Sequence, residues 1–162
     1  MTVRSVAAVG LLALSTITLV GCGKSDPPPP PPPPVLELTV SGSADQNPGA
    51  DGTPRPVAVH LYQLAATDKF TNADGFAWVE HEQSTLGADE LSSSEFVLKP
   101  SEKQEMKQDL KPGTKALGVA VWFYDINNAK WRASASVAAN GPTKLVLNVG
   151  KLSVSLEPAP SK

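Results

Sequence analysis

Sulfur and imidazole ligands are scarce in this 162-residue chain, which contains one cysteine and two histidines. So small a set cannot build a common zinc or iron–sulfur site, and the sequence has neither a CxxC pair nor an HExxH helix. The net charge is only −2, from 14 basic and 16 acidic residues, so the chain lacks the basic field that nucleic-acid binding requires. These deficits argue against metal centres, thiol chemistry and polyanion binding.

Long hydrophobic runs are also missing, apart from one at the N-terminus. Arg4 precedes an apolar run from Val6 to Val20, whose 15 residues match a secretory signal and fall short of the roughly 20 that span a membrane. The run ends in Leu19-Val20-Gly21-Cys22, which resembles the bacterial lipoprotein signal, where the cysteine thiol accepts a diacylglyceryl group. We therefore expect residues 1–21 to be removed and Cys22 to carry covalent lipid, with no cofactor or metal.

The residues that follow predict where the lipid resides and how far the folded part stands from it. In Gram-negative lipoproteins an Asp after the acylated cysteine commonly favours the inner membrane, so Gly23 indicates the outer membrane. Pro27 to Pro34 are eight consecutive prolines, which form a polyproline II rod about 25 Å long. We interpret residues 22–34 as lipid attachment and spacer; a proline-rich ligand for an aromatic groove is the alternative.

Beyond residue 34, apolar residues alternate with polar ones, which is typical of strands with one buried face. Turn sequences such as Lys111-Pro112-Gly113 separate these segments at short spacing, which argues for antiparallel neighbours in a sandwich. Leu117 to Tyr124 is apolar on both faces, so we expect it to be a central strand. About eight strands are predicted, at 36–40, 57–62, 95–98, 103–110, 117–124, 133–137, 145–149 and 152–156.

One stretch, around residues 68–92, lacks this alternation. Phe70, Trp78 and Leu86 lie there among Asp, Glu, Ala and Gln, which predicts a short helical insertion packed over a sheet face or the end of the sandwich. The expected fold is mainly β, a two-sheet antiparallel sandwich over residues 35–158 with a tail at 159–162. The roughly 125 residues that remain after the signal and prolines suffice for one domain.

The two histidines are the candidates for acid–base chemistry, and neither lies in a nucleophile motif such as GxSxG. Glu80-His81-Glu82 is a poor metal cluster because adjacent helix residues do not share a face. A calcium loop from Asp68 to Gly75 is excluded because Phe70 occupies a position that needs an oxygen ligand. We predict no catalytic residue, no metal site and no enzyme activity.

The segment from Ser43 to Pro56 joins the first two strands and is longer than the usual hairpin loop of two to five residues. Long loops are commonly either functional or disordered. Two prolines inside the segment, in addition to Pro56 at its end, limit its freedom before binding, which favours recognition.

Short motifs along the remaining chain, together with the lipoprotein signal, complete the pattern. They include Arg55-Pro56-Val57, Tyr62-Gln63-Leu64, Phe70 with Ala73-Asp74 and Phe76, Leu86-Gly87-Ala88-Asp89, Glu95-Phe96-Val97-Leu98, Leu117-Gly118-Val119-Ala120 with Phe123 and Asp125, and Trp131-Arg132. In this order they resemble the outer-membrane lipoprotein of bacterial type VI secretion systems, the TssJ (SciN/VasD) family. The resemblance covers roughly residues 35 to 157.

This resemblance implies a transthyretin-like sandwich, lipid-anchored in the outer membrane and facing the periplasm. It also implies a non-enzymatic task without a small-molecule substrate, namely binding the periplasmic C-terminal domain of a TssM-type inner-membrane subunit and tethering the trans-envelope complex. In the family the loop between the first two strands contributes to this contact, and Asn47 and Pro48 match its recurring Asn-Pro. The partner-binding loop is therefore expected to use Asn47, Pro48, Gly49, Ala50, Asp51 and Gly52.

Two other functions remain open on the sequence alone. One is a lipoprotein β-sandwich module that binds a glycan or another periplasmic ligand and is unrelated to secretion. The other is a transthyretin-like hydrolase with a pocket centred on His60 or His81.

If the loop is the partner site, we expect substitutions at Asn47 and Asp51 to weaken partner capture without altering the melting temperature, because exposed loop changes usually cost less than about 0.5 kcal/mol of stability.

Overall fold

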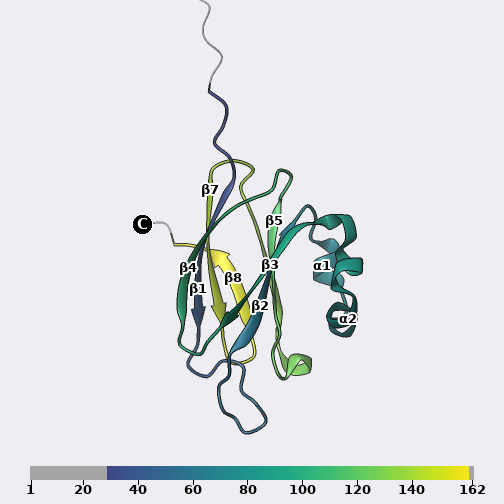
Figure 1. Cartoon of the computed structure of the whole chain (residues 1–162), viewed down its shortest axis with the longest axis vertical. Helices are drawn as coiled ribbons and strands as arrows, with labels where there is room; N and C mark the ends of the chain where they lie inside the picture. The colour runs from purple at the N-terminus through teal and green to yellow at the C-terminus, as the bar shows by residue number, and fades with distance from the viewer. Residues whose placement is uncertain (1–28, 161–162) are drawn as a thin grey trace, which may run out of the picture. The chain divides into compact units, whose positions relative to one another are not determined.

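The computed structural model describes residues 29–160, apart from the side chains of residues 76, 77, 79, 80 and 83. The predicted signal, Cys22 and the first part of the spacer lie outside the described residues. Within residues 29–160 no helix is long and apolar enough to cross a membrane. Eight strands form two four-stranded sheets, so the predicted two-sheet sandwich is confirmed (Figure 1).

Each sheet combines strands that are distant in the sequence. The first has the order β4-β1-β7-β8 and the second β3-β2-β5-β6. The strands of the first sheet are β4 (Lys103–Asp109), β1 (Val35–Gly42), β7 (Pro142–Val149) and β8 (Val154–Pro158). Those of the second are β3 (Glu90–Leu98), β2 (Val57–Leu64), β5 (Ala116–Val121) and β6 (Arg132–Ser136).

One strand pair departs from the antiparallel arrangement that the sequence predicts. β1 and β7 pair in parallel, with Val35 opposite Pro142 and Gly42 opposite Val149. The other five strand pairs are antiparallel. Short turns favour antiparallel neighbours only for strands that follow each other in the chain, and β1 and β7 do not, so no turn fixes their relative direction.

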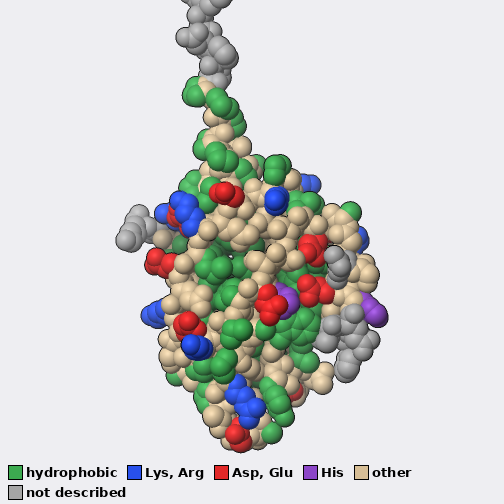
Figure 2. All heavy atoms as spheres, viewed as in Figure 1, with side chains coloured by type: hydrophobic (Ala, Val, Ile, Leu, Met, Phe, Trp, Pro, Cys, Tyr) green, Lys and Arg blue, Asp and Glu red, His purple; other side chains and the backbone are tan. Residues whose placement is uncertain are grey.

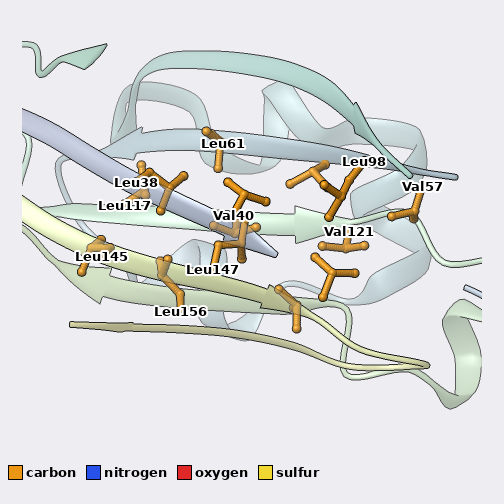
Figure 3. Close-up of a cluster of buried hydrophobic side chains, with 14 of the residues drawn as sticks. Leu38, Val40, Val57, Leu61, Leu98, Leu117, Val121, Leu145, Leu147 and Leu156 are labelled. Carbon is orange, nitrogen blue, oxygen red and sulfur yellow. The ribbon is translucent and has the colours of Figure 1, made fainter. Parts of the chain in front are cut away.

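The core lies between the two sheets and is built from the inward-facing residues of their strands (Figure 3). On β1, Leu36, Leu38 and Val40 are at most 2% exposed, whereas Glu37 and Thr39 between them point outward. All six residues of β5 are buried, as expected for a central strand covered on both faces. β5 ends at Val121, three residues before the predicted strand does.

The outer face of β2 and β5 is covered by the helical insertion, on the right in Figure 1. It consists of α1 (Asp68–Asn72), α2 (Gly75–Leu86) and a 3₁₀ turn, η1 (Gly87–Asp89), which confirms the predicted insertion except that β3 already begins at Glu90. Phe70 and Trp78 are at most 1% exposed and pack on Tyr62. Gly118 permits this approach, because a Cβ there would lie 2.8 Å from Leu64 Cδ1 and 3.1 Å from the Phe70 ring.

The direction of β1 places its first residue, Val35, and the long loop at opposite ends of the sandwich. Val35 directly follows the prolines, and its N–H donates to the Gly141 carbonyl (3.0 Å). Gly42 directly precedes the loop of residues 43–56. Because an eight-residue strand is about 26 Å long, the loop lies far from the point where the chain enters β1 (Figure 1).

Candidate functional site

The tip of the β1–β2 loop is a small ordered turn. The Gly49 N–H donates to the Thr53 carbonyl (3.0 Å), and the Gly52 N–H donates to the Gly49 carbonyl (2.9 Å). Gly52 has a φ of +76°, a left-handed conformation that glycine adopts without steric cost. The loop therefore presents a defined shape at its tip, formed by residues 49–53.

The base of the loop is tied to the sandwich. The Ser43 N–H donates to the Val149 carbonyl (2.8 Å), and the Arg55 N–H donates to the Gln46 carbonyl (3.2 Å). The Gln46 side chain is fully buried, and its Nε2 donates to the Leu98 carbonyl (2.8 Å). These hydrogen bonds, from both halves of the loop, hold its base in place, so its tip projects from an ordered base.

Asn47, the first residue of the predicted partner-binding set, lies in this base and is 5% exposed. Its Nδ2 donates to the Pro56 carbonyl (2.9 Å), and its Oδ1 accepts the N–H of Tyr124 (2.7 Å). The residue has a φ of 46°, a conformation that asparagine tolerates better than most residues. Its side chain therefore links the β1–β2 loop to the loop between β5 and β6.

The other five predicted residues range from half-buried to exposed. Pro48 and Gly49 are half-buried, whereas Ala50, Asp51 and Gly52 are exposed. Asp51 Oδ1 accepts the Thr53 N–H (3.1 Å) and lies 3.3 Å from Nη2 of Arg55. The hydrogen bonds from Thr53 and, to a lesser degree, the Arg55 charge hold the pKa of Asp51 below its usual range, so it is ionised at neutral pH.

Tyr124, which the sequence did not single out as a site residue, lies beside this tip. Its side chain is 62% exposed, and the Arg55 guanidinium carbon lies 5.6 Å from the centre of its ring. Tyr124 follows the end of β5 and precedes the 3₁₀ turn η2 (Ile126–Asn128). In the sequence, the only sign that Tyr124 lies outside the strand was the polar segment that follows it, Asp125-Ile126-Asn127-Asn128.

The buried position of Asn47 changes the expected outcome of its substitution. We expect Asn47→Ala to lower the free energy of unfolding by about 1–3 kcal/mol, because the Pro56 carbonyl and the Tyr124 N–H each lose a partner. Asp51→Ala, at an exposed position of the same loop, is expected to change it by less than about 0.5 kcal/mol. Urea unfolding of both variants checks this difference, and equal stabilities would contradict the assignment of Asn47 to the base.

The histidines lie away from this loop. His60 Nδ1 is 3.6 Å from Glu82 Oε2, and His60 Nε2 is 3.4 Å from Glu95 Oε2, so the ring lies between two carboxylates. It also packs against Trp122, at a centroid distance of 5.5 Å. His81 is exposed, at a kink in α2 where its own φ and ψ are non-helical. Among the described side chains, no group of three or more His, Cys, Asp and Glu could hold a metal ion.

Comparison with known proteins places the chain among secretion proteins. The family model described as "Type VI secretion lipoprotein, VasD, EvfM, TssJ, VC_A0113" matches residues 34–152. No curated protein matches the sequence.

Solved structures with the same fold include the following three. The T6SS lipoprotein TssJ1 from Pseudomonas aeruginosa is 29% identical with a TM-score of 0.75, over 81% of this chain and 100% of that one. Serratia marcescens Lip, described as a membrane-bound component of the type VI secretion system, is 19% identical with a TM-score of 0.70. The match covers 80% of this chain and 99% of Lip. A chain in a structure described as the T6SS protein TssM C-terminal domain from EAEC is 24% identical with a TM-score of 0.61, over 78% and 99%.

Proposed function

Because the chain belongs to the family of type VI secretion lipoproteins, we propose that it is held in the outer membrane by lipid on Cys22 and binds a TssM-type subunit. The contact is made with the periplasmic C-terminal domain of that inner-membrane subunit. Binding at one end and lipid at the other tie the trans-envelope complex to the outer membrane. The task is mechanical and needs no catalytic group.

The observation that carries the proposal is that the β1–β2 loop projects from one end of the sandwich as an ordered, exposed turn. The loop is braced at its base by Gln46 and Asn47, and its tip is exposed. A partner that binds a pre-ordered loop loses less conformational entropy than one that must first order it. The loop is therefore suited to recognition rather than to joining two strands alone.

The positions of Val35 and the loop at opposite ends of β1 support the same function. The chain enters β1 at Val35, and the loop begins at the other end of that strand. A lipid-anchored protein that binds a partner from the far side of the periplasm must present its binding surface away from its membrane attachment. The octaproline spacer adds about 25 Å of reach between lipid and β1.

The likeness to solved structures adds support for the partner. The structure described as a TssM C-terminal domain contains a chain with this fold, and the Serratia protein is described as membrane bound. Both likenesses are below 25% identity and establish the shared fold. The binding of a TssM-type partner by this chain can be tested directly.

That test uses the full-length acylated protein, purified in detergent and immobilised, with the C-terminal periplasmic domain of the TssM-type subunit from the same secretion system as probe. We expect Asp51→Lys to weaken binding at least about tenfold, because it replaces the acid that pairs with Arg55 at the loop tip. The matched control is Glu157→Lys, the same charge change at an exposed position on β8, and it should bind like the wild type.

Peptidoglycan fragments serve as the second probe in the same assay. Wild-type protein that binds these fragments but not the TssM-type domain would overturn the proposal and favour a glycan-binding module. Equal binding of the TssM-type domain by Asp51→Lys and Glu157→Lys would place the contact elsewhere on the sandwich.

A further inference from the structure

The loop between β5 and β6 carries an exposed aromatic side chain next to the proposed partner site. Among the side chains that the structure describes, Tyr124 (62%) and Val97 (55%) are the exposed large hydrophobic ones. A lone exposed hydrophobic residue is common on protein surfaces and needs no explanation. Tyr124 differs from Val97 because it belongs to an ordered array of side chains.

This array consists of Asp51, Arg55 and Tyr124. Asp51 Oδ1 lies 3.3 Å from Arg55 Nη2, and the Arg55 guanidinium carbon lies 5.6 Å from the centre of the Tyr124 ring. Arg55 thus contacts an acid of its own loop and an aromatic ring of the other loop. Side chains of both charges are visible at this lower end of the molecule (Figure 2). Tyrosine and arginine are the residue types that most often dominate the binding energy of protein interfaces.

The backbone that leads into Tyr124 is fixed. Its N–H donates to the buried Oδ1 of Asn47 (2.7 Å), and the preceding residue, Phe123, is only 4% exposed in the core. Tyrosine has only two side-chain torsions, so a ring held in this way loses little conformational entropy when a partner covers it. The ring is exposed and preorganised, the two properties expected of an interface anchor.

We propose that Tyr124 is the aromatic anchor of the partner surface, which therefore spans two loops, and that Asn47 is the positioning residue that joins them. This inference rests on the proposed function, because it assigns a further contact to the same partner. The partner segment that fits is a protein surface with an apolar side chain against the Tyr124 ring. The same segment offers a carbonyl or carboxylate oxygen to the remaining N–H groups of Arg55.

The test measures binding of the TssM-type periplasmic domain to full-length protein in detergent, with three variants. Tyr124→Ala is expected to raise the Kd at least about tenfold, mainly through faster dissociation. Tyr124→Phe keeps the ring and should stay within about threefold of the wild type. Val97→Ala, the matched control at the other exposed hydrophobic side chain, should bind like the wild type. Because Tyr124 is exposed, its variants should keep the wild-type unfolding midpoint.

A double-mutant cycle then examines the contact between the two loops. The effects of Arg55→Ala and Tyr124→Ala should combine to less than the product of their separate fold-changes, because each removes part of one array. Multiplicative effects would refute a shared array.

Two results separate this inference from the proposed function. If Asp51→Lys loses binding while Tyr124→Ala binds like Val97→Ala, Tyr124 is not an anchor and the proposed function stands. If the wild-type protein does not bind the TssM-type domain at all, the proposed function fails and this inference fails with it.

Discussion

Replacing Cys22 with serine is expected to move the protein almost completely from the membrane fraction to the soluble periplasmic fraction. Each buried CH₂ of an acyl chain contributes about 0.8 kcal/mol to membrane binding, and a serine cannot form the thioether that holds the lipid. The 13 basic and 16 acidic residues that remain without residues 1–21 give no electrostatic attraction to an anionic surface. Cell fractionation with radiolabelled palmitate measures the loss directly.

The same variant is expected to fold normally, because residues 35–158, which hold all eight strands, contain no cysteine. The matched control is Gly23→Asp, which keeps the acylated cysteine and should remain membrane-bound while shifting towards the inner membrane. Secretion should fail in Cys22→Ser, since the complex loses its attachment. Full secretion by a variant without acylation would show that the lipid is not the attachment.

Replacing Trp78 with alanine is expected to lower the free energy of unfolding by about 3–5 kcal/mol, the range observed when a large buried aromatic side chain is truncated. Trp78 is 0% exposed, and its ring centroid lies 5.5 Å from that of Tyr62 and 5.2 Å from that of Phe70. The deletion removes the Trp78 part of the contact between the helical insertion and the outer face of β2. Thermal unfolding should show a decrease of about 10 °C or more in Tm.

Trp122→Ala is the matched control for this prediction. Trp122 borders the same cluster but is only partly buried, so its removal should cost less. A loss of stability as small in Trp78→Ala as in Trp122→Ala would show that the insertion is not held by its buried tryptophan. Binding of the TssM-type domain by folded Trp78→Ala should persist, since Trp78 packs on Tyr62, Phe70 and Trp131, whereas the proposed contacts are made by Asp51, Arg55 and Tyr124.

The strands were predictable because their signal is local. Alternation of Leu36, Leu38 and Val40 with Glu37 and Thr39 identifies both the strand and its buried face. The helical insertion was predictable for the complementary reason, that its apolar residues break this alternation. The parallel pairing of β1 with β7 has no local signal, because paired residues such as Val35 and Pro142 are 107 positions apart in the chain.

The long loop between the first two strands was predictable, but the structural roles of its residues were not. Loop length and the Asn-Pro motif identified the loop between β1 and β2. The sequence predicted that Asn47 contacts the partner, whereas the structure buries its side chain against Pro56 and Tyr124. Asn is a common turn residue, and whether it faces solvent or another segment depends on what folds over it.

The sequence by itself determined the positions of the strands and of the helical insertion, and it predicts an export signal, a lipid attachment site at Cys22 and a proline spacer. These properties depend on residues that are adjacent or nearly adjacent in the chain. Only the tertiary structure decided that Tyr124 lies against Arg55 across 69 positions of sequence, and that Asn47 holds their two loops together. Such contacts depend on which strands become neighbours, which is set by the packing of the whole core rather than by any local pattern.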